Sequence, residues 1–416
     1  MFDRELADRD FDVVVVGAGP AGLAAACRAA ECGQRVAMLD DNPQPGGQIW
    51  RGVSKEAAGW VRSAERNGVE WMAGARVFDA PEPQQLAVEM FDSECRVKYR
   101  KLILATGARE RFLPFPGWTL PNVMGAGGLQ ALAKSGLPLA GKRVVIAGSG
   151  PLLLAVARYM KAHRVDVRLI AEQASRAALV HFGMRLAGHP AKLVQAVSLR
   201  AGLMGVPYIT SCWPVSAQGR EKLDSVTLRR ASGRTWTEPC EYLACGFGLI
   251  PSVELAALLG CRMSQVVVEV DEHQQTSVPG VYSAGEATGI GGLELSLVEG
   301  EIAGYAAGGN TDRAAALFSA RAKYRKFADA LEKAFALRKE LHDLPRPDTF
   351  VCRCEDVTIE RVRACSNWRE AKLHTRCGMG PCQGRICGGA LEFFLGWQSE
   401  SVRPPVLPAR VGSLSS

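Results

Sequence analysis

The first forty residues alternate between apolar runs and small residues in the order of a strand, a turn, a helix and a second strand. Residues 13–16 are consecutive valines and predict a buried strand, and an Ala-rich stretch with helical spacing follows the glycines at 17–22. Residues 36–39 are again apolar and predict the next strand. This order predicts a βαβ unit, and therefore an α/β fold with parallel strands.

A second unit of the same kind begins near Lys142. An apolar strand leads into Gly148-Ser149-Gly150, an apolar helix follows, and the next strand ends on Glu172. Residues 174–203 have helical spacing, and residues 321–343 follow an amphipathic helical stripe. Three other segments run from an apolar strand into small residues that let backbone approach a ligand: 101–118, 241–252 and 278–292.

The first turn carries the complete dinucleotide fingerprint in its strand–turn–helix context. Gly17 permits the tight turn, Gly19 lets the backbone approach a pyrophosphate, and Gly22 lets helix and strand pack closely. The N-terminus of the helix supplies N–H donors to the phosphates. Asp40 ends the second strand, where a carboxylate accepts hydrogen bonds from ribose hydroxyls. The predicted site comprises Gly17, Gly19, Pro20, Ala21, Gly22 and Asp40.

The second turn departs from the fingerprint because Leu153 replaces its third glycine. Gly148, Gly150 and Glu172 nevertheless form a candidate second nucleotide site. Two interpretations stay open: the turn binds a nucleotide, or it is a structural relic of a nucleotide site.

Cysteines cluster near the C-terminus. Six of the thirteen fall within 36 residues, namely Cys352, Cys354, Cys365, Cys377, Cys382 and Cys387. Two irons need four thiolates from two facing loops, and the assigned ligands are Cys352, Cys354, Cys382 and Cys387. Cys377 is the alternative ligand, and Cys365 is expected in the core. Structural zinc is the competing interpretation, although zinc pairs usually have C-x₂₋₄-C spacing.

Composition and charge narrow the class of protein further. The 416 residues are 47% hydrophobic and 22% charged, which excludes a disordered or fibrous chain. No apolar run approaches the ~18 residues of a membrane span, and the acidic start of the chain lacks a secretory signal, so a cytoplasmic protein is expected. From Arg321 onward 17 basic residues stand against 11 acidic ones. That excess is either a solvated surface or a docking face for an acidic partner, and no nucleic-acid module is indicated.

Breaks in the pattern predict five segments. The sequence LPRPD at 344–348 separates the amphipathic helix from the cysteine-rich part. We expect a first dinucleotide-binding domain of 1–118 and 250–315, an inserted second domain of 119–249, a connecting helix of 316–346, a cluster module of 347–398 and an extended tail of 399–416.

Most of the chain up to the connecting helix resembles the two-dinucleotide-binding-domain flavoproteins, the group that contains thioredoxin and glutathione reductases. The resemblance is carried by both glycine turns, Ala105-Thr106-Gly107 and Ser283-Ala284-Gly285-Glu286. It implies two Rossmann-like domains, the second inserted in the first, and FAD in the first. It also adds site residues: Gly47, Gln48, Thr106, Gly107, Gly285 and Glu286. Because that family usually has Asp where this chain has Glu286, the cofactor stays open between FAD and another ADP-containing nucleotide such as ATP or NAD.

Disulfide reductases of this group carry a redox-active cysteine pair, and this chain departs from them. The stretch after the second predicted strand reads PGGQIW at 45–50, without cysteine. Cys27 and Cys32 fall on the first helix, behind the turn. A simple disulfide reductase is therefore not expected.

The cysteine motifs, Cys352-Arg353-Cys354-Glu355 and the run from Arg376 to Cys387, resemble the bacterioferritin-associated-ferredoxin-like (BFD-like) [2Fe-2S] module. With PGGQIWR and ACGFGLIPS, they make the whole chain similar to the larger (A-type or alpha) subunits of heteromeric opine oxidases, D-hydroxyproline dehydrogenases and dye-linked proline dehydrogenases. The B-type subunit of hydrogen cyanide synthase belongs to the same group, and the alpha subunit of heterotetrameric sarcosine oxidase is a more distant relative.

This resemblance implies that the chain relays electrons and bears no catalytic residue for amine oxidation. The amine or imino acid would be oxidised at FAD on a D-amino-acid-oxidase-like beta subunit. Further implied parts are FMN at the interface, a small ferredoxin-like subunit, and a quinone or other respiratory acceptor at the inner face of the cytoplasmic membrane. The open alternatives are the B-type subunit of hydrogen cyanide synthase, with glycine as substrate, a stand-alone NAD(P)H-dependent flavin reductase, and a non-catalytic nucleotide-binding scaffold.

Overall fold

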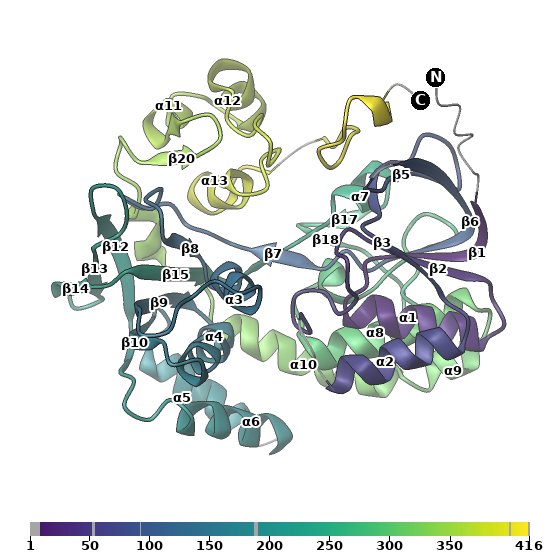
Figure 1. Cartoon of the computed structure of the whole chain (residues 1–416), viewed down its shortest axis with the longest axis horizontal. Coiled ribbons are helices and arrows are strands. Elements are labelled where there is room, and N and C mark those ends of the chain that lie inside the picture. The colour runs from purple at the N-terminus through teal and green to yellow at the C-terminus, as the bar shows by residue number, and fades with distance from the viewer. Residues whose placement is uncertain (1–8, 52–54, 92, 187–189, 399–400, 415–416) are drawn as a thin grey trace. The chain divides into compact units, whose positions relative to one another are not determined.

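The computed structural model describes residues 9–414 except 52–54, 92, 187–189 and 399–400. The chain divides into two compact units (Figure 1). Unit 1 consists of Met1–Arg109, Ile250–Asp329 and Glu400–Ser416, and unit 2 of Glu110–Leu249 and Ala330–Ser399. The predicted insertion of one dinucleotide fold into the other is thus confirmed. The acidic start of the chain, residues 1–8, lies outside the described residues.

Unit 1 is built on a seven-stranded sheet in the order β3-β2-β1-β6-β5-β4, with β19 also pairing with β6. The pairs formed by β1, β2, β3, β6 and β19 are parallel, whereas β4 and β5 extend the sheet in antiparallel fashion. The strands are β1 (Arg9–Val16), β2 (Val36–Asp40), β3 (Glu70–Ala73), β4 (Arg76–Asp79), β5 (Gln85–Glu89), β6 (Glu94–Leu104) and β19 (Val281–Ser283).

Helices cover the sheet of unit 1 because its central strands are apolar on both faces. Val13 and Val15 of β1 pack with α1 and α8, and Val14 packs on the other face with Leu255 of α7. The helices are α1 (Pro20–Glu31), α2 (Lys55–Arg66), α7 (Glu254–Leu258), α8 (Leu293–Ala307) and α9 (Thr311–Ala315), with the 3₁₀ helix η2 (Gly285–Thr288) and the small ribbon β17 (Met263–Ser264) and β18 (Val267–Val268).

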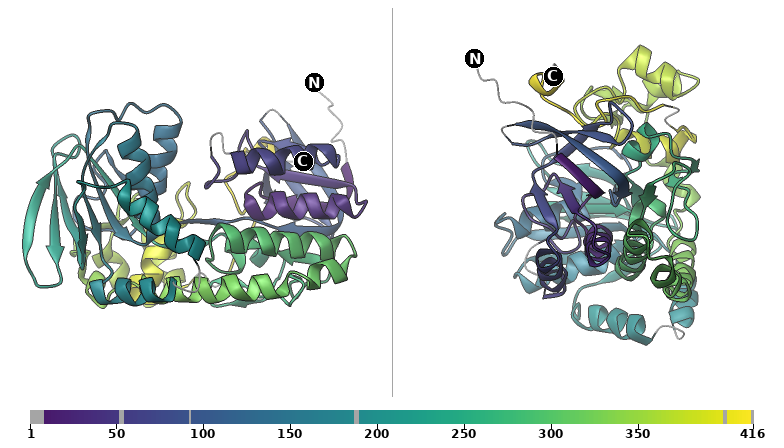
Figure 2. Two further views of the ribbon diagram at one scale, coloured as in Figure 1. Left: turned by 90° about the horizontal axis from the view of Figure 1, so that it is seen from below. Right: turned by 90° about the vertical axis from the view of Figure 1, so that its right-hand side faces the viewer.

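The helices α1 and α8 lie against each other in both views (Figures 1 and 2). A Cβ on Gly300 of α8 would lie 2.2 Å from the carbonyl oxygen of Ala21, and one on Gly304 would lie 2.4 Å from that of Ala25. Glycine at these two positions therefore lets the helices approach to backbone contact, which holds the start of α1 in place beneath the first glycine turn.

Unit 2 contains a five-stranded parallel sheet in the order β11-β10-β9-β15-β8 and an antiparallel three-stranded sheet, β12-β13-β14. The strands are β8 (Val123–Gly125), β9 (Arg143–Ser149), β10 (Asp166–Glu172), β11 (Tyr208–Thr210), β12 (Cys212–Gln218), β13 (Ser225–Arg230), β14 (Thr235–Pro239) and β15 (Tyr242–Phe247). The helices are α3 (Ala126–Lys134), α4 (Pro151–Ala162), α5 (Arg176–Arg185) and α6 (Pro190–Ala201), and β7 (Ala108–Glu110) pairs with β16 (Leu249–Pro251) where the chain crosses between units.

The cysteine-rich part belongs to unit 2 and packs on its core. Phe394 and Ala390 of α13 share one apolar cluster with Phe112, Trp213 and other residues of the inserted fold. Trp118 Nε1 donates a 2.7 Å hydrogen bond to the carbonyl of Phe350. The elements are β20 (Phe350–Cys352), β21 (Val357–Thr358), α11 (Ile359–Arg363), α12 (Trp368–Thr375) and α13 (Cys387–Leu395).

The predicted helix over 321–343 is wrong beyond Ala334. The helix α10 runs over Phe318–Ala334, and the chain resumes as the 3₁₀ helix η3 (Lys339–Asp343). Just beyond the helix, the carbonyl groups of Phe335 and Ala336 accept hydrogen bonds from side chains of the inserted fold. None of the described helices combines the length and the apolar character needed to cross a membrane.

The tail returns to unit 1 and ends in η4 (Gly412–Leu414). The backbone N–H of Val406 donates a 2.8 Å hydrogen bond to the carbonyl of Phe78 on β4. Glu89 of β5 accepts hydrogen bonds from the side chains of Arg410, at 3.0 Å, and Ser413, at 2.9 Å. Residues 401–414 are therefore attached to the antiparallel edge of the sheet.

Candidate functional site

In the first glycine turn, close backbone contacts leave no room for a side chain at two of the glycines, whereas the third faces open space. Gly17 has φ +105°, and a Cβ there would lie 2.2 Å from the carbonyl oxygen of Ala105; one on Gly22 would lie 1.8 Å from that of Gly17. A Cβ on Gly19 would meet only the Cα of Gly47, at 4.0 Å. The space above Gly19 thus fits an approaching pyrophosphate, as predicted for this position.

Other predicted residues surround this turn. Gly47, with φ +59°, lies over Gly19, and Gly285, with φ +77°, lies against Ala21, since Cβ atoms added there would come within 2.9 Å of Gly19 Cα and 2.8 Å of Ala21 Cβ. Pro20 opens α1, whose N-cap residue Gly19 offers no side-chain cap. The first N–H groups of α1 therefore stay available for a phosphate.

Asp40 is held at the end of β2 by the turn itself. Its Oδ2 accepts a 2.7 Å hydrogen bond from the backbone N–H of Ala18, and its Oδ1 accepts from the N–H and side chain of Asn42. Asn42 in turn accepts from Arg51 at 3.1 Å. Asn42 and Arg51 are site residues that sequence reasoning missed, because a single sequence does not show what lies beside the ribose position.

Three predicted residues have less direct roles in the structure. Thr106 uses its hydroxyl to donate a 2.5 Å hydrogen bond to the carbonyl of Ser252, and Gly107 accepts from the N–H of Ser252 at 2.9 Å. Both residues therefore hold the segment around Ser252 beside the segment that follows β6. Gln48 is exposed.

Glu286 supplies a clear test of whether a nucleotide or flavin fits. Its Oε1 accepts a 3.0 Å hydrogen bond from the N–H of Gly292, while its Oε2 is buried without a partner among the described residues. Burial raises the pKa of Glu286 to about 7. A buried carboxyl oxygen without a partner is costly, so a ligand hydroxyl that donates to it fits the site.

Glu299 is a further site residue that the sequence analysis missed. It is 1% exposed and accepts hydrogen bonds from the N–H of Gly285, at 3.1 Å, and from Thr288 and Arg325. The sequence alone does not single it out, because the same helix also carries Glu294 and Glu301. Glu299 thereby fixes the turn that presents Glu286.

The second glycine turn has similar close backbone contacts, but the acid at the end of its second strand, Glu172, is buried. A Cβ on Gly148 would lie 1.9 Å from the carbonyl oxygen of Gly246, whereas Gly150 is open. Glu172 is fully buried, and its two oxygens accept from the N–H groups of Gly150, at 2.9 Å, and Ala174, at 2.8 Å. Burial raises the pKa of Glu172 to about 7. This acid is therefore not exposed to a ribose, unlike the partly exposed Asp40.

Three buried thiols meet in the cysteine-rich part. The sulfur atoms of Cys352, Cys377 and Cys387 all lie within 4.8 Å of one another. Hydrogen bonds from Cys377 and Cys387, aided by the N–H groups of Gly378 and Glu355, lower the pKa of Cys352 to about 2. The hydrogen bond to Cys352 raises the pKa of Cys377 to about 12. A thiolate surrounded by sulfur and N–H donors is suited to iron–sulfur ligation.

The other two candidate ligands lie side by side. The backbone N–H of Cys382 donates to the sulfur of Cys354, and a Cβ on Gly380 would lie 2.3 Å from the Cβ of Cys354. The four predicted ligands thus divide into two members of the buried trio and one neighbouring pair, and the alternative ligand Cys377 completes the trio. Cys365, expected in the core, is partly exposed, and its thiol lies 3.7 Å from the carbonyl of Arg361.

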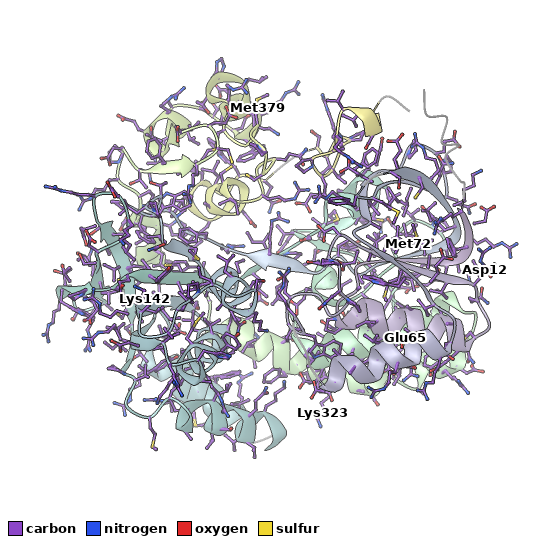
Figure 3. The ribbon with its side chains drawn as sticks, viewed as in Figure 1. Asp12, Glu65, Met72, Lys142, Lys323 and Met379 are labelled. Carbon is purple, nitrogen blue, oxygen red and sulfur yellow. The ribbon has the colours of Figure 1, made fainter. Side chains whose placement is uncertain are left out.

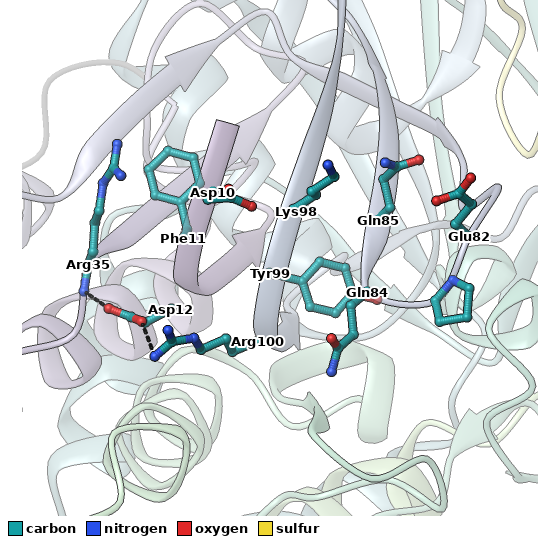
Figure 4. Close-up of a pocket in the computed structure, with 11 residues that line it drawn as sticks. Asp10, Phe11, Asp12, Arg35, Glu82, Gln84, Gln85, Lys98, Tyr99 and Arg100 are labelled. Atoms are coloured by element: carbon teal, nitrogen blue, oxygen red, sulfur yellow. Dashed lines mark hydrogen bonds and ion pairs between the residues drawn. The ribbon is translucent and has the colours of Figure 1, made fainter. Parts of the chain in front are cut away.

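A depression of about 510 Å³ in unit 1 has no part in this site (Figure 4). It lies at the amino end of β1 and beside the middle of β6, where Asp12 accepts from the N–H of Arg35 at 2.9 Å and pairs with Arg100 at 3.1 Å. Ligands of parallel α/β sheets bind at the carboxyl ends of the strands. The glycine turn, at the carboxyl end of β1, is therefore a better candidate for the cofactor site than this depression.

The fold and these sites define a two-domain dinucleotide-binding oxidoreductase with a thiol-rich module. The family profile described as pyridine nucleotide-disulphide oxidoreductase matches residues 11–304, and the chain belongs to this family. The family implies FAD in the first site, and the cysteine cluster is compatible with a [2Fe-2S] centre.

Individual relatives extend the match over the whole chain. The A-type subunit of opine oxidase from Rhizobium meliloti is 34% identical over 97% of this chain and 98% of its own length. Hydrogen cyanide synthase subunit HcnB of Pseudomonas protegens is 32% identical over 90% of each chain. The chain thus belongs to the group that contains these two subunits, as the sequence motifs predicted. L-proline dehydrogenase from P. horikoshii shares the fold, with a TM-score of 0.68 at 18% identity over 100% of this chain and 81% of that one.

Proposed function

We propose that this chain is the electron-transfer subunit of a heteromeric dehydrogenase or oxidase whose partner subunit oxidises an amino acid, an opine, or an imino acid such as D-hydroxyproline or proline. The observation that carries the proposal is the presence, in one chain, of an open dinucleotide turn with the unpartnered Glu286 and of a cluster of thiols around Cys352. Oxidation of a C–N bond releases two electrons and two protons. A flavin takes the pair, and an iron–sulfur cluster passes the electrons on singly.

The partner in this proposal is a D-amino-acid-oxidase-like beta subunit, with FMN at the interface. A further component is a small ferredoxin-like subunit. The relatives that support the proposal are themselves named as subunits. Hydrogen cyanide synthase is the second candidate because HcnB matches over 90% of this chain. The stand-alone NAD(P)H reductase is disfavoured by the sealed second turn, where Glu172 has no exposed oxygen.

We place the exit of electrons at the loops that bear the cysteines. Met379, between Cys377 and Cys382, is 51% exposed at the outer surface of the module (Figure 3), and Ile386 is 42% exposed. Arg376 in the same loop is paired with Glu355 at 2.8 Å. An apolar contact with an electron acceptor suits this face better than a charged one.

For the place of action we propose the inner face of the cytoplasmic membrane, reached through the helices α5 and α6. Residues 174–220 contain no acidic residue. The exposed apolar side chains of this region include Val180, Met184, Leu193, Val194, Val197 and Met204. Exposed apolar side chains with basic neighbours are typical of a helix that binds anionic lipid.

Vesicles test the membrane proposal. The full chain should sediment with vesicles that contain phosphatidylglycerol and not with pure phosphatidylcholine, and less so at high salt. Val194→Glu with Val197→Glu should abolish binding, whereas Val411→Glu, at an exposed site of the tail, should not. Equal binding by all three proteins would contradict the proposal.

The relay itself is tested with an artificial electron acceptor. Dye-linked turnover of D-hydroxyproline, proline, octopine, nopaline and glycine is measured with the chain alone and with the co-expressed partner subunit. We expect turnover only with the partner, and the substrate that is used separates the dehydrogenase from hydrogen cyanide synthase. Turnover by the chain alone would overturn the relay.

A further inference from the structure

The second glycine turn is covered by the chain's own connecting segment, residues 335–338. The hydroxyl of Ser149, the middle residue of the turn, donates a 2.9 Å hydrogen bond to the carbonyl of Phe335. Gln173 follows β10, at the place where a nucleotide ribose would be recognised. Its amide nitrogen donates to the carbonyls of Phe335, at 3.3 Å, and Ala336, at 3.1 Å. Its amide oxygen accepts from the N–H of Arg338 at 3.1 Å.

The polar side chains of Ser149, Glu172 and Gln173 at this turn are therefore already paired. Gln173 is fully buried and also donates to the hydroxyl of Ser149 at 2.9 Å. Glu172 gives both carboxyl oxygens to backbone N–H groups. A nucleotide would have to break these buried hydrogen bonds, and a buried polar group left unpaired costs about 1–3 kcal/mol.

Side chains anchor the segment at both ends. The ring of Phe335 packs edge-on against Phe182 of α5, with 5.7 Å between ring centres. The guanidinium of Arg338 lies over the ring of Trp213 at 5.4 Å. The contacts are made to α5 and β12, so the segment is fixed to the inserted fold by packing as well as by hydrogen bonds.

The same segment leads directly into the thiol-bearing part. After Arg338 come η3 and Leu344, and Leu341 and Leu344 share an apolar cluster with Phe394 of α13. Cys387 begins α13. The placement of α13 thus depends on the placement of the connecting segment.

We propose that the second dinucleotide fold receives the connecting segment in place of a nicotinamide nucleotide, and that Gln173 is the positioning residue which fixes this segment and the module behind it. The glycine turn acts as a receptor for backbone carbonyls of the same chain. This role is independent of the substrate of the partner subunit.

In the first test, the full, cofactor-loaded chain is titrated with NADH and with NADPH. Binding is detected by calorimetry and by tryptophan fluorescence. We expect no saturable binding up to about 1 mM nucleotide. Saturable binding in the micromolar range would overturn the proposal, whatever the behaviour of any variant.

The second test uses trypsin, which cleaves after Lys333, Arg338 and Lys339. Gln173→Ala should increase cleavage at Arg338 and Lys339 about tenfold, because local opening exposes the segment. It should also shift the midpoint potential of the cluster while the iron content is kept. Gln218→Ala, at an exposed glutamine of β12, should change neither quantity. Ser149→Ala removes a single hydrogen bond to the segment and should give a smaller increase in cleavage. Wild-type cleavage rates in both Gln173→Ala and Ser149→Ala would contradict the positioning role.

Discussion

The carboxylate of Glu299 accepts a hydrogen bond of 3.1 Å from the backbone N–H of Gly285. A buried acid on α8 therefore fixes the turn that presents Glu286 toward the first glycine turn. Burial raises the pKa of Glu299, and Arg325 and Thr288 oppose that rise. Burial thus favours the protonated form of Glu299, and its hydrogen-bond donors favour the charged form.

Replacing Glu299 should loosen this turn. Glu299→Gln removes the charge that faces Arg325, and we expect a loss of about 3 kcal/mol in the free energy of unfolding together with faster loss of flavin on dialysis. Thermal unfolding and the flavin content after dialysis measure the two effects. Glu301→Gln, which breaks the ion pair with Arg28 on the same helix, should leave the flavin content unchanged. Equal flavin loss in both variants would show that Glu299 has no special role.

The ligand set is tested by single cysteine replacements. We expect the purified chain to hold about two irons and two acid-labile sulfides. Cys352→Ser and Cys377→Ser should abolish the visible absorbance of the cluster, because both thiols belong to the buried trio. Cys365→Ala should keep it, since this thiol is not one of the three that meet. Stoichiometric zinc without visible absorbance would contradict the iron–sulfur assignment.

The first glycine turn should separate cofactor binding from stability. Gly19→Ala adds a Cβ that meets only Gly47 Cα at 4.0 Å, so the protein should fold while its nucleotide affinity falls about tenfold or more. Gly22→Ala places a Cβ 1.8 Å from a carbonyl oxygen and should reduce the yield of folded protein. Nucleotide released on denaturation and the melting temperature are the measurements. Full cofactor content in Gly19→Ala would show that the pyrophosphate does not pass this residue.

Glu172 makes stability depend on pH. Its pKa is raised to about 7 by burial, so its contribution is complete at acid pH and is lost as pH rises from about 4.5 to 7. Denaturant unfolding should show this loss, at up to about 1.4 kcal/mol per pH unit. Glu172→Gln should flatten the profile over that range, and Glu221→Gln, at an exposed acid of the same unit, should not. An unchanged pH profile in Glu172→Gln would show that another group causes the pH dependence of stability.

The tail should detach in acid. Burial opposes the charge of Glu89, but hydrogen bonds from Arg410 and Ser413 outweigh it and lower the pKa of Glu89. Because the folded pKa is lowered, this stabilisation is present near neutral pH and is lost as pH falls below about 4. Arg410→Ala should expose the tail at neutral pH, which trypsin cleavage after Arg403 would report. Slow cleavage in that variant would show that other contacts hold the tail.

Local pattern determined much of this protein. The valine run, the spacing from Gly17 to Gly22 and the acid at position 40 predict a dinucleotide turn because each reports backbone geometry within a few residues. The clustering of cysteines predicted a thiol site for the same reason. The motifs also placed the chain in its family, since their spacing is specific.

Tertiary packing decided the rest. The sequence favoured Cys354 for its C-x-C spacing and Cys382 for the Gly380-Pro381 loop before it. Packing, in contrast, brought Cys377 together with Cys352 and Cys387. The partners of Glu299 come from different elements, and Ser149 meets Phe335 across 186 positions of sequence. Periodicity records which face of an element is apolar, but it does not record which distant segment covers that face. Whether the second glycine turn is open or closed is therefore set by the packing of the connecting segment.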